Sequence, residues 1–433
     1  MTRRFYLKSF GCKVNQCDGN ALARTLTEMG LERTSDPSAA ELCIVNGCTV
    51  TARADAKCMK LVRSVRRINP DTHIAITGCT AVRLNGAHPE RTDADSIVTC
   101  SDANAWRRLI DTLPCPSGPG SRAPAAPSAR TRAFVKVQDG CDAFCTYCIV
   151  PHVRGGPRSM AREQIFAEIE RALERGCKEI VLTGTRLGSF GAELDGAQSF
   201  ASLVAEIDRR YHVPRIRLSS IEPNDLTDEL FETFAQVGTV QHHVHVPLQS
   251  GDPDVLRRMN RSYTPEEFMA AVGRLRALWP DVGVTTDVLV GFPGETEEAF
   301  DNTIRVIEET RFSRLHVFRF SPRPGTPAAS MPDRVGSHEL HARSRRMVEL
   351  GNRLAAEFAA RQIGTAVEVL VESRRDDKSG HLLGLTGNYL TAVLPDATDR
   401  MINCIVPVRV READGATLIC EPTVLSPLPL GEG

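Results

Sequence analysis

The sequence lacks a long apolar run, and its first residues, MTRRFYLKSFGC, turn polar before a signal-peptide core could form. It also lacks an excess of charge of one sign. The 53 Lys and Arg residues face 54 Asp and Glu residues, and a net charge of −1 provides no global basic field for nucleic acid. No repeat of fixed period is present, which argues against a solenoid. We therefore expect a cytoplasmic protein of two or three domains that makes no contact with a membrane.

Cysteine is the informative residue: 14 are too few for a disulfide scaffold in 433 residues, yet many for a cytosolic enzyme. Three of them, Cys141, Cys145 and Cys148, lie in the run QDGCDAFCTYCIVPHVRG. This C-x3-C-x2-C spacing can hold three irons of a [4Fe–4S] cube and leave the fourth iron without a protein ligand. A zinc knuckle or a disulfide corner is the alternative. Zinc would want a fourth ligand, and His152 is not obviously placed to supply it.

Residues 1–113 alternate between strand-like and helix-like segments. We expect strands in RFYLKSF, ELCIVNG and HIAITG, and helices in CDGNALARTLTEMG and TARADAKCMKLVRSVRRIN. This order predicts a small parallel sheet covered by helices. Cys12, Cys48 and Cys79 each follow a strand almost at once. Because the carboxyl ends of parallel strands share one edge, we expect these thiols to converge as a second three-thiolate site, although a buried apolar cysteine is the ordinary alternative.

The rest of the chain divides into a linker and two further blocks. Residues 114–130, rich in Pro, Ala, Ser and Gly, predict a flexible linker. From residue 131 to 320, six strand-like runs alternate with helical ones, which predicts a partial, open TIM-like barrel. A long helix follows, and five short β runs between residues 363 and 425 predict a small β-barrel. We expect the tail, residues 426–433, to be disordered.

Several polar residues follow the barrel strands, at the face where such barrels carry their chemistry. Thr183 and Gly184 end the second strand, Glu222 lies after the third, and Gln249 lies in PLQSG. Each could bind a cofactor or substrate, and each could equally be structural, because buried polar atoms need partners anyway. The histidines of HHVHVPL resemble a metal cluster, but alternate strand residues face opposite sides, so core or substrate-lining roles are favoured. Three arginines beside the cysteine loop could form a local basic groove: Arg154, Arg158 and Arg162.

These blocks, in this order, resemble the radical S-adenosylmethionine (SAM) methylthiotransferases over nearly the whole chain. FGCKVNQ, NGCTVTARADAK and ITGC resemble the segments that carry the family's auxiliary-cluster cysteines, and GCDAFCTYCIVPHVRG resembles its radical SAM loop. SSIEP, HVPLQSGDPDVLRRMNRSYT, TDVLVGFPGET and FRFSPRPGTPAA resemble later barrel segments. The CKVNQ start and LTGTRLGSFG are most similar to the MtaB branch, which acts on N6-threonylcarbamoyladenosine in tRNA.

The resemblance implies an α/β fold with three domains. These are an N-terminal cluster domain (residues 1–113), a radical SAM partial (β/α)6 barrel (residues 131–362) and a TRAM-like β-barrel (residues 363–425). It implies two [4Fe–4S] clusters, with SAM bound at the open iron of one of them. The expected metal ligands are Cys12, Cys48 and Cys79 for the auxiliary cluster, and Cys141, Cys145 and Cys148 for the radical SAM cluster. SAM contacts are expected from Thr183, Gly184, Glu222 and Gln249.

The implied reaction replaces a C–H of an adenine with C–S–CH3, so the implied partners are tRNA, an electron donor and a sulfur donor. Radical chemistry is needed because that hydrogen is neither acidic nor hydridic. The alternatives are isopentenyladenosine in tRNA, an aspartate of ribosomal protein S12, or a non-catalytic electron-transfer or RNA-binding protein. Two residues depart from the family pattern: Gly47 stands where Thr is usual, and Arg186 where Asn is common. The segment from residue 361 to 433 carries seven Lys and Arg and ten Asp and Glu, a net of −3, which is unexpected for an RNA-binding module.

Overall fold

The computed structural model describes residues 2–84, 92–113, 131–194 and 198–423, which form two compact units. One unit comprises Met1–Ser128, Asp139–Gly156 and Ser321–Ala329, and the other comprises Ala129–Gln138, Pro157–Phe320 and Ser330–Gly433. Each unit is described by itself. The expected linker (114–130) and tail (426–433) lie outside the described residues.

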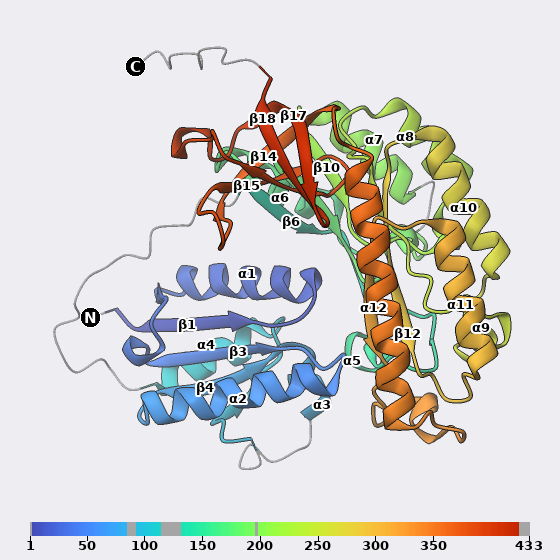
Figure 1. Cartoon of the computed structure of the whole chain (residues 1–433). Helices are drawn as coiled ribbons and strands as arrows, with labels where there is room; N and C mark the ends of the chain where they lie inside the picture. The colour runs from blue at the N-terminus through green and yellow to red at the C-terminus, as the bar shows by residue number, and fades with distance from the viewer. Residues whose placement is uncertain (1, 85–91, 114–130, 195–197, 424–433) are drawn as a thin grey trace. The chain divides into compact units, whose positions relative to one another are not determined.

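The first unit is built on a five-stranded parallel sheet of order β2-β1-β3-β4-β5. This is the strand order of flavodoxin-like sheets, in which ligands bind at the carboxyl ends of the strands. Helices α1 and α2 lie on opposite faces of the sheet (Figure 1). The strands are β1 (Arg4–Ser9), β2 (Glu32–Thr34), β3 (Leu42–Gly47), β4 (His73–Thr77) and β5 (Ser96–Ile97). The helices are α1 (Lys13–Glu28), α2 (Ala52–Ile68), α3 (Gly78–Leu84), α4 (Ala103–Thr112) and the short α5 (Val150–Arg154).

The sequence pattern accounts for this sheet. Every residue of β3 is buried, because the strand has helices on both faces. One core joins α1 and α4 through Leu26 and Trp106, and the other joins α2 to the opposite face through Val62. The expected strands β1, β3 and β4 and the expected helices α1 and α2 are confirmed. The sequence analysis missed β2 and β5, which are three and two residues long, as well as α3 and α4.

The second unit contains the six expected barrel strands, all parallel where they pair. They form two sheets, β6-β9-β10 and β11-β12-β13, which two isolated bridges, Ile216↔Val240 and Ser220↔His245, join across β10 and β11. No pairing between β6 and β13 is found within the described part of the chain, so the barrel is open. The strands are β6 (Arg132–Lys136), β9 (Glu179–Thr183), β10 (Arg215–Leu218), β11 (His243–His245), β12 (Gly283–Val290) and β13 (Arg314–Arg319). The open α/β barrel confirms the predicted fold class.

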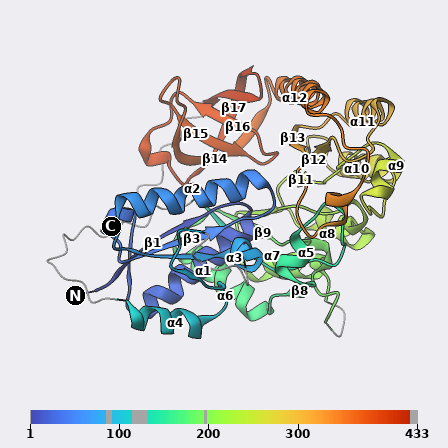
Figure 2. The same cartoon turned by 90° about the horizontal axis from the view of Figure 1, so that it is seen from below.

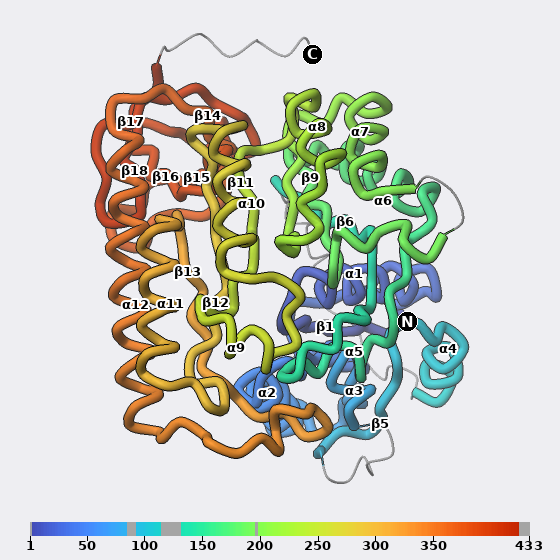
Figure 3. Tube along the Cα trace, turned by 90° about the vertical axis from the view of Figure 1, so that its right-hand side faces the viewer, coloured from blue at the N-terminus to red at the C-terminus, as the bar shows by residue number. Residues whose placement is uncertain are grey.

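Helices alternate with these strands, and α10, α11 and α12 run side by side (Figure 3). Their apolar faces pack on the strands in one continuous core. The helices are α6 (Arg162–Glu174), α7 (Phe200–Arg210), α8 (Asp228–Gln236), α9 (Pro253–Arg258), α10 (Pro265–Leu278), α11 (Glu297–Thr310) and α12 (Ser337–Ala360). Two-residue strands flank the cysteine loop, β7 (Gln138–Asp139) and β8 (Arg158–Ser159). Among the described residues, none of the helices combines the length and apolarity needed to cross a membrane.

The C-terminal strands close into the expected small barrel, of order β14-β15-β16-β18-β17, with β17 pairing back to β14 (Figure 2). Closure pairs the edge strands with each other and leaves no open edge. The strands are β14 (Ala366–Arg375), β15 (Leu382–Thr386), β16 (Thr391–Leu394), β17 (Ile405–Asp414) and β18 (Thr417–Pro422).

A buried ion pair joins this small barrel to the larger one within the second unit. Arg217 on β10 and Glu179 on β9 have side chains that are 1% and 0% exposed, and two hydrogen bonds of 2.8 and 3.0 Å connect them. The same guanidinium donates to the carbonyls of Thr386 and Gly387 in the small barrel, at 3.1 and 2.9 Å. The two barrels are therefore held together through a charge that has no access to water.

Candidate functional site

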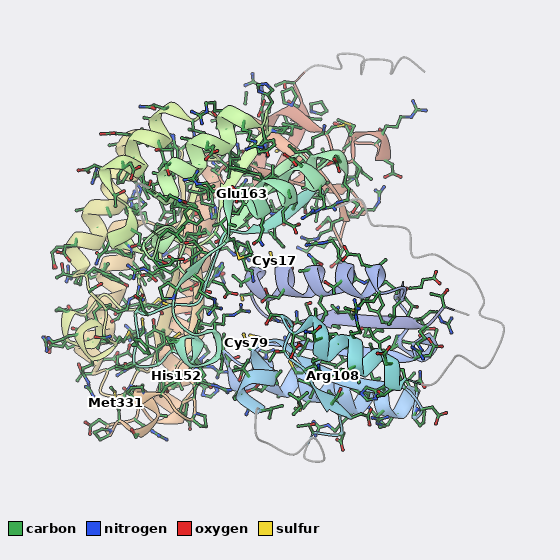
Figure 4. The ribbon with its side chains drawn as sticks, turned by 180° about the vertical axis from the view of Figure 1, so that it is seen from behind. Cys17, Cys79, Arg108, His152, Glu163 and Met331 are labelled. Atoms are coloured by element: carbon green, nitrogen blue, oxygen red, sulfur yellow. The ribbon has the colours of Figure 1, made fainter. Side chains whose placement is uncertain are left out.

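The three strand-end cysteines of the first unit gather at one edge of its sheet. Cys12 precedes the first turn of α1 and Cys48 follows β3. Cys79, labelled in Figure 4, lies in the first turn of α3, directly after β4. The chain passes close to itself here, because a Cβ atom on Gly11 would lie 2.5 Å from the Sγ of Cys48. Gly11 has a φ of +87°, so glycine permits both the turn and the approach.

Burial dominates the electrostatics of these thiols, and the neighbouring thiols contribute to it. Burial raises the pKa of Cys79 to about 12, and the neighbouring Cys12 and Cys48 raise it further. Burial also raises the pKa of Cys48, again with a contribution from Cys12. The raised pKa values of Cys48 and Cys79 are compatible with a metal cluster, because a coordinated thiol is deprotonated by the metal. The loops that carry the three cysteines therefore meet at one edge of the sheet, and their role as ligands of an iron–sulfur cluster with one open iron stays a prediction.

Two buried asparagines, which the sequence analysis did not assign, fix the loops that carry these thiols. Asn15 donates from Nδ2 to the carbonyl of Phe10 at 2.8 Å and to that of Asn46 at 3.2 Å. Asn46 donates in return to the carbonyl of Asn15 at 2.7 Å and to Ser9 Oγ at 3.0 Å. Both side chains are fully buried, so every lost bond would leave an unsatisfied polar group. Only Asn46 gave a signal in the sequence, as an amide inside the apolar run LCIVNG, whereas Asn15 lies in the first turn of α1 among other polar residues.

The second cysteine set, Cys141, Cys145 and Cys148, occupies a single loop of the same unit. The loop starts at Gly140, whose φ is +74° and where a Cβ atom would lie 1.9 Å from the carbonyl oxygen of Gly156. Its two ends are tied by a 3.0 Å hydrogen bond from the Cys141 amide to the Gly155 carbonyl. Within the loop, the Cys148 amide donates to the Cys145 carbonyl at 2.9 Å, and the Ala143 amide lies 3.4 Å from the Sγ of Cys141. These hydrogen bonds hold the loop that carries the three sulfur donors in a compact conformation, as a cluster requires.

Arg154 lies beside the first cysteine set of this unit. It lies at the end of α5, is only 9% exposed, and forms ion pairs with Asp139 at 2.8 Å and Asp18 at 3.0 Å. It also lies against Cys79, where the guanidinium favours the thiolate and so opposes the rise in the pKa of that thiol. Arg154 thus places a positive charge beside sulfur atoms that become anionic when they bind metal.

Of the three arginines expected to form a basic groove beside the loop, Arg158 is exposed and the other two are paired with carboxylates. Arg154 is buried and paired with two carboxylates, and Arg162 forms an ion pair with Glu206 in the second unit. Neither charge is free for a nucleic acid, because the local carboxylates already neutralise both.

Arg323 was also missed by the sequence analysis. It lies in the FRFSPRPGT segment, belongs to the first unit, and is 5% exposed. Its guanidinium donates to Thr49 Oγ1 at 2.8 Å and to the carboxylate of Asp55. Because Thr49 directly follows Cys48, this buried pair holds the loop of one of the converging cysteines. Only the tertiary fold brings residues so far apart in sequence together.

In the second unit, the expected cofactor contacts lie at the carboxyl ends of successive strands. Thr183 ends β9 and is buried, and a Cβ atom on Gly184 would lie 3.1 Å from the side chain of Gln138. Glu222 follows β10 and forms an ion pair with Arg261, while burial raises the pKa of the Glu222 carboxyl. Gln249 has a φ of +62°. Its amide donates to the carbonyl of Asp287 on β12, and its carbonyl accepts from the amide of Leu289, both at 2.9 Å. This is the face of an α/β barrel that binds ligands.

The histidines of the HHVHVPL run lie on two sides of their strand, as the alternation of strand residues predicted. His243 and His245 both hydrogen-bond to Thr285 Oγ1, at 3.1 and 2.9 Å, whereas His242 stacks on Trp279. The structure instead brings together His245, Asp287 and His316 on three neighbouring strands. Asp287 Oδ1 lies 3.3 Å from His245 Nε2 and 3.5 Å from His316 Nδ1.

Three protein-family models match the chain. Residues 4–99 match uncharacterized protein family UPF0004, residues 135–307 match the radical SAM superfamily, and residues 360–422 match the TRAM domain. A relative from Bacillus subtilis (strain 168), threonylcarbamoyladenosine tRNA methylthiotransferase MtaB, is 36% identical over 94% of this chain and 93% of its own length. A tRNA-2-methylthio-N(6)-dimethylallyladenosine synthase from Desulfitobacterium hafniense (strain Y51) is 32% identical over 95% of this chain and 96% of its own.

This chain belongs to the radical SAM methylthiotransferase family. The family assignment confirms the resemblance that the sequence motifs indicated. Among solved structures, the radical SAM methyltransferase TsrM from Kitasatospora setae is similar in fold, with a TM-score of 0.56 at 17% identity, covering 76% of this chain and 77% of that one.

Gly47 and Arg186, which depart from the family pattern, both contact other side chains of this methylthiotransferase. A Cβ atom on Gly47 would lie 2.4 Å from Thr80 Oγ1, so the Thr80 hydroxyl occupies the space that a larger residue would need. Arg186 donates two hydrogen bonds to Asp225, at 3.0 and 2.8 Å. Both residues therefore fit their surroundings without displacing a cysteine.

Proposed function

We propose that this methylthiotransferase adds a methylthio group to N6-threonylcarbamoyladenosine in tRNA. The observation that carries the proposal is that two separate sets of three cysteines lie in one compact unit, and we assign each set to a cluster with one open iron. Two relatives named for threonylcarbamoyladenosine, from Bacillus subtilis and Chlamydia pneumoniae, are 36% and 34% identical over nearly the whole chain and support this substrate. Relatives named for dimethylallyladenosine are about as similar, which makes that base the alternative.

The cofactors of the family are SAM and two [4Fe–4S] clusters. We assign the auxiliary cluster to Cys12, Cys48 and Cys79, and the radical SAM cluster to Cys141, Cys145 and Cys148. When bound, this set supplies the electron, the radical and the methylthio group that the reaction needs. We assign the SAM contacts to Thr183, Gly184, Glu222 and Gln249, which end neighbouring barrel strands.

The protein's own contribution is to fix the donors and their charges. The amide network of Asn15 and Asn46 and the buried Arg323 hold the strand-end loops, so the thiols converge without induced movement. Arg154 provides a permanent positive charge beside Cys79. We further propose a cytoplasmic location, an electron donor and a sulfur donor as partners.

The test is nucleoside mass spectrometry of tRNA from a host that lacks this activity, with and without the gene. A gain of one methylthio group on threonylcarbamoyladenosine is the expected result. A gain on isopentenyladenosine would retain the family and change the substrate. No gain on either base, in a protein that contains both clusters, would contradict a tRNA substrate and favour a protein side chain such as a ribosomal aspartate.

Cysteine variants separate the two assigned sites. Cys148→Ala should abolish both SAM cleavage and tRNA modification, whereas Cys79→Ala should abolish modification and retain SAM cleavage. Each should lower the iron content from about eight to about four per chain. Cys43→Ala is the matched control, because Cys43 is fully buried within β3 and is assigned to no site. Failure to cleave SAM under strong reductant, with both clusters present, would instead favour a non-catalytic iron–sulfur protein.

A further inference from the structure

Helix α2 carries the densest positive charge on the first unit. Its 17 residues include six Lys and Arg residues and one carboxylate, Asp55. Five of the cations are exposed, and within the described residues no carboxylate or hydrogen-bond partner is assigned to any of them. They are Arg53, Lys57, Lys60, Arg63 and Arg67.

The exposed cations form a single stripe. Arg53, Lys57, Lys60 and Arg67 are spaced by four, three and seven residues, and at 100° per residue they fall within about 80° of the helix circumference. At 1.5 Å per residue the stripe extends for about 21 Å. The buried face of the same helix carries Cys58, Val62 and Val65, so packing against the sheet directs the cations outward.

The two other charges of α2 do not neutralise this stripe. Asp55 faces the protein, where it forms ion pairs with Arg323 and Arg83. Arg66, the sixth cation, pairs with Asp95 and donates to two backbone carbonyls. The solvent face is therefore of one sign, in a protein whose net charge is only −1.

The TRAM domain, the other candidate for RNA binding, has a less favourable charge. Three of its arginines are engaged within the domain. Arg375 pairs with Asp399, Arg411 with Glu421, and Arg409 donates to the carbonyl of Gly364. With a net charge of −3 from residue 361 to 433, this segment repels a phosphate backbone overall.

The stripe begins close in sequence to one of the cysteines assigned to the auxiliary cluster. Helix α2 begins four residues after Cys48, so Arg53 is close in sequence to the assigned auxiliary site and Arg67 is at the far end of the helix. A phosphate backbone along α2 would thus extend away from the cysteines that converge at the sheet edge. Regularly spaced cations on one helix face suit a polyanion, which gains affinity by counterion release at each phosphate it contacts.

We infer that the exposed face of α2, comprising Arg53, Lys57, Lys60, Arg63 and Arg67, is a binding site for the phosphate backbone of RNA. The inference rests on the proposed function and identifies its RNA as the tRNA substrate. The contacts would position the tRNA without reading its sequence, because phosphate contacts carry no base information.

The size of the effect follows from counterion release. Each phosphate contact contributes a slope of about 0.7 to 0.9 in a plot of log affinity against log salt, or about four- to fivefold in affinity near 0.15 M salt. Neutralising two contacting arginines should therefore weaken binding about 20-fold and reduce the slope by about 1.6.

The experiment measures the binding of a labelled tRNA, isolated from a host lacking methylthiolation, to the cluster-loaded full-length protein by fluorescence anisotropy. It compares the wild type with the double variant Arg63→Gln, Arg67→Gln, between about 50 and 200 mM salt. The matched control is Arg107→Gln, Arg108→Gln on α4, which removes two exposed arginines from the other face of the same sheet (Figure 4). Equal iron content and circular dichroism establish that all three proteins are folded.

The α2 variant should bind about 20-fold more weakly, with a smaller salt slope, and the α4 variant should bind like the wild type. Wild-type affinity and slope in the α2 variant would overturn the inference and leave the proposed function intact. Equal weakening in both variants would also overturn it, because it would indicate a diffuse field in place of a defined face. A wild-type protein that modifies no tRNA in the mass-spectrometric test would instead remove the proposed function itself.

Discussion

The geometry of Gly140 yields a sharp prediction about the radical SAM loop. Gly140 → Ala introduces a methyl group at a residue with a φ of +74°, and its ideal position is 1.9 Å from the carbonyl oxygen of Gly156. The next residue is Cys141, whose amide donates to the Gly155 carbonyl at 3.0 Å. The backbone must shift to relieve the clash, and this shift displaces a cysteine assigned to the cluster.

Two costs add at this position. A left-handed conformation costs an alanine about 1–2 kcal/mol. The clash is with a backbone atom, which cannot rotate away, and overpacking of this kind costs about 1–3 kcal/mol more. The total loss in the free energy of unfolding is therefore about 2–5 kcal/mol.

The matched control is Gly30→Ala at the end of α1. Gly30 has a φ of +89°, but no atom lies within 4 Å of its ideal Cβ position. This variant should show the conformational cost of about 1–2 kcal/mol alone. Chemical denaturation measures both losses, and iron analysis of the reconstituted proteins reports the clusters. The Gly140 variant should lose about half of its iron, and the Gly30 variant should retain all of it.

Equal iron content and equal stability in the two variants would refute this reasoning. That result would mean that the loop relaxes around the methyl group at no cost, and that the close contact with Gly156 does not constrain Cys141.

Three further predictions follow from buried charges. Glu179→Gln leaves the buried guanidinium of Arg217 without a carboxylate and should reduce the free energy of unfolding by about 3–5 kcal/mol in a denaturant titration. Arg154→Gln withdraws a positive charge from Cys79 and should lower the reduction potential of the auxiliary cluster in an EPR-monitored titration of a chain without the radical SAM cysteines. Burial lowers the pKa of His73, so the unfolded chain binds a proton that the native chain does not. The free energy of unfolding should therefore fall as the pH drops below about 6.5. His73→Asn should flatten this dependence.

Each of these has its own control. Glu308→Gln breaks an exposed ion pair with Arg353 and should cost less than about 1 kcal/mol; a similar cost for Glu179→Gln would contradict the burial argument. Arg154→Lys retains the charge and should shift the potential less than the Gln variant does, so equal shifts would exclude an electrostatic origin. His212→Asn alters an exposed histidine and should leave the acid slope unchanged, whereas an unchanged slope in the His73 variant would be inconsistent with its burial.

Much of the fold could be predicted because its signals are local. Apolar runs such as LCIVNG predicted buried strands, and glycine and proline marked where helices end, so all six strands of the larger barrel and all five of the smaller were anticipated. The short β2 and β5 could not be predicted, because two or three residues carry no periodicity and are ordered only by the strands beside them.

For the candidate site, too, some features could be predicted from the sequence and others could not. The spacing of Cys141, Cys145 and Cys148 favours their proximity, since the first and last are only seven residues apart in the chain. The convergence of Cys12, Cys48 and Cys79 was predicted from the topology of parallel strands. The roles of Asn15 and Arg323 were not predicted, because a polar residue in a motif has no assigned partner until the chain is folded.

The sequence by itself determined the order of the blocks, the residue types that can bind iron and the family to which the chain belongs. Tertiary structure alone decided which charges are free. Arg154, Arg162 and Arg375 are paired with carboxylates distant in sequence, whereas five of the six arginines and lysines of α2 face solvent. A count of charges cannot make this distinction, because neutralisation depends on distances of a few ångströms that folding sets.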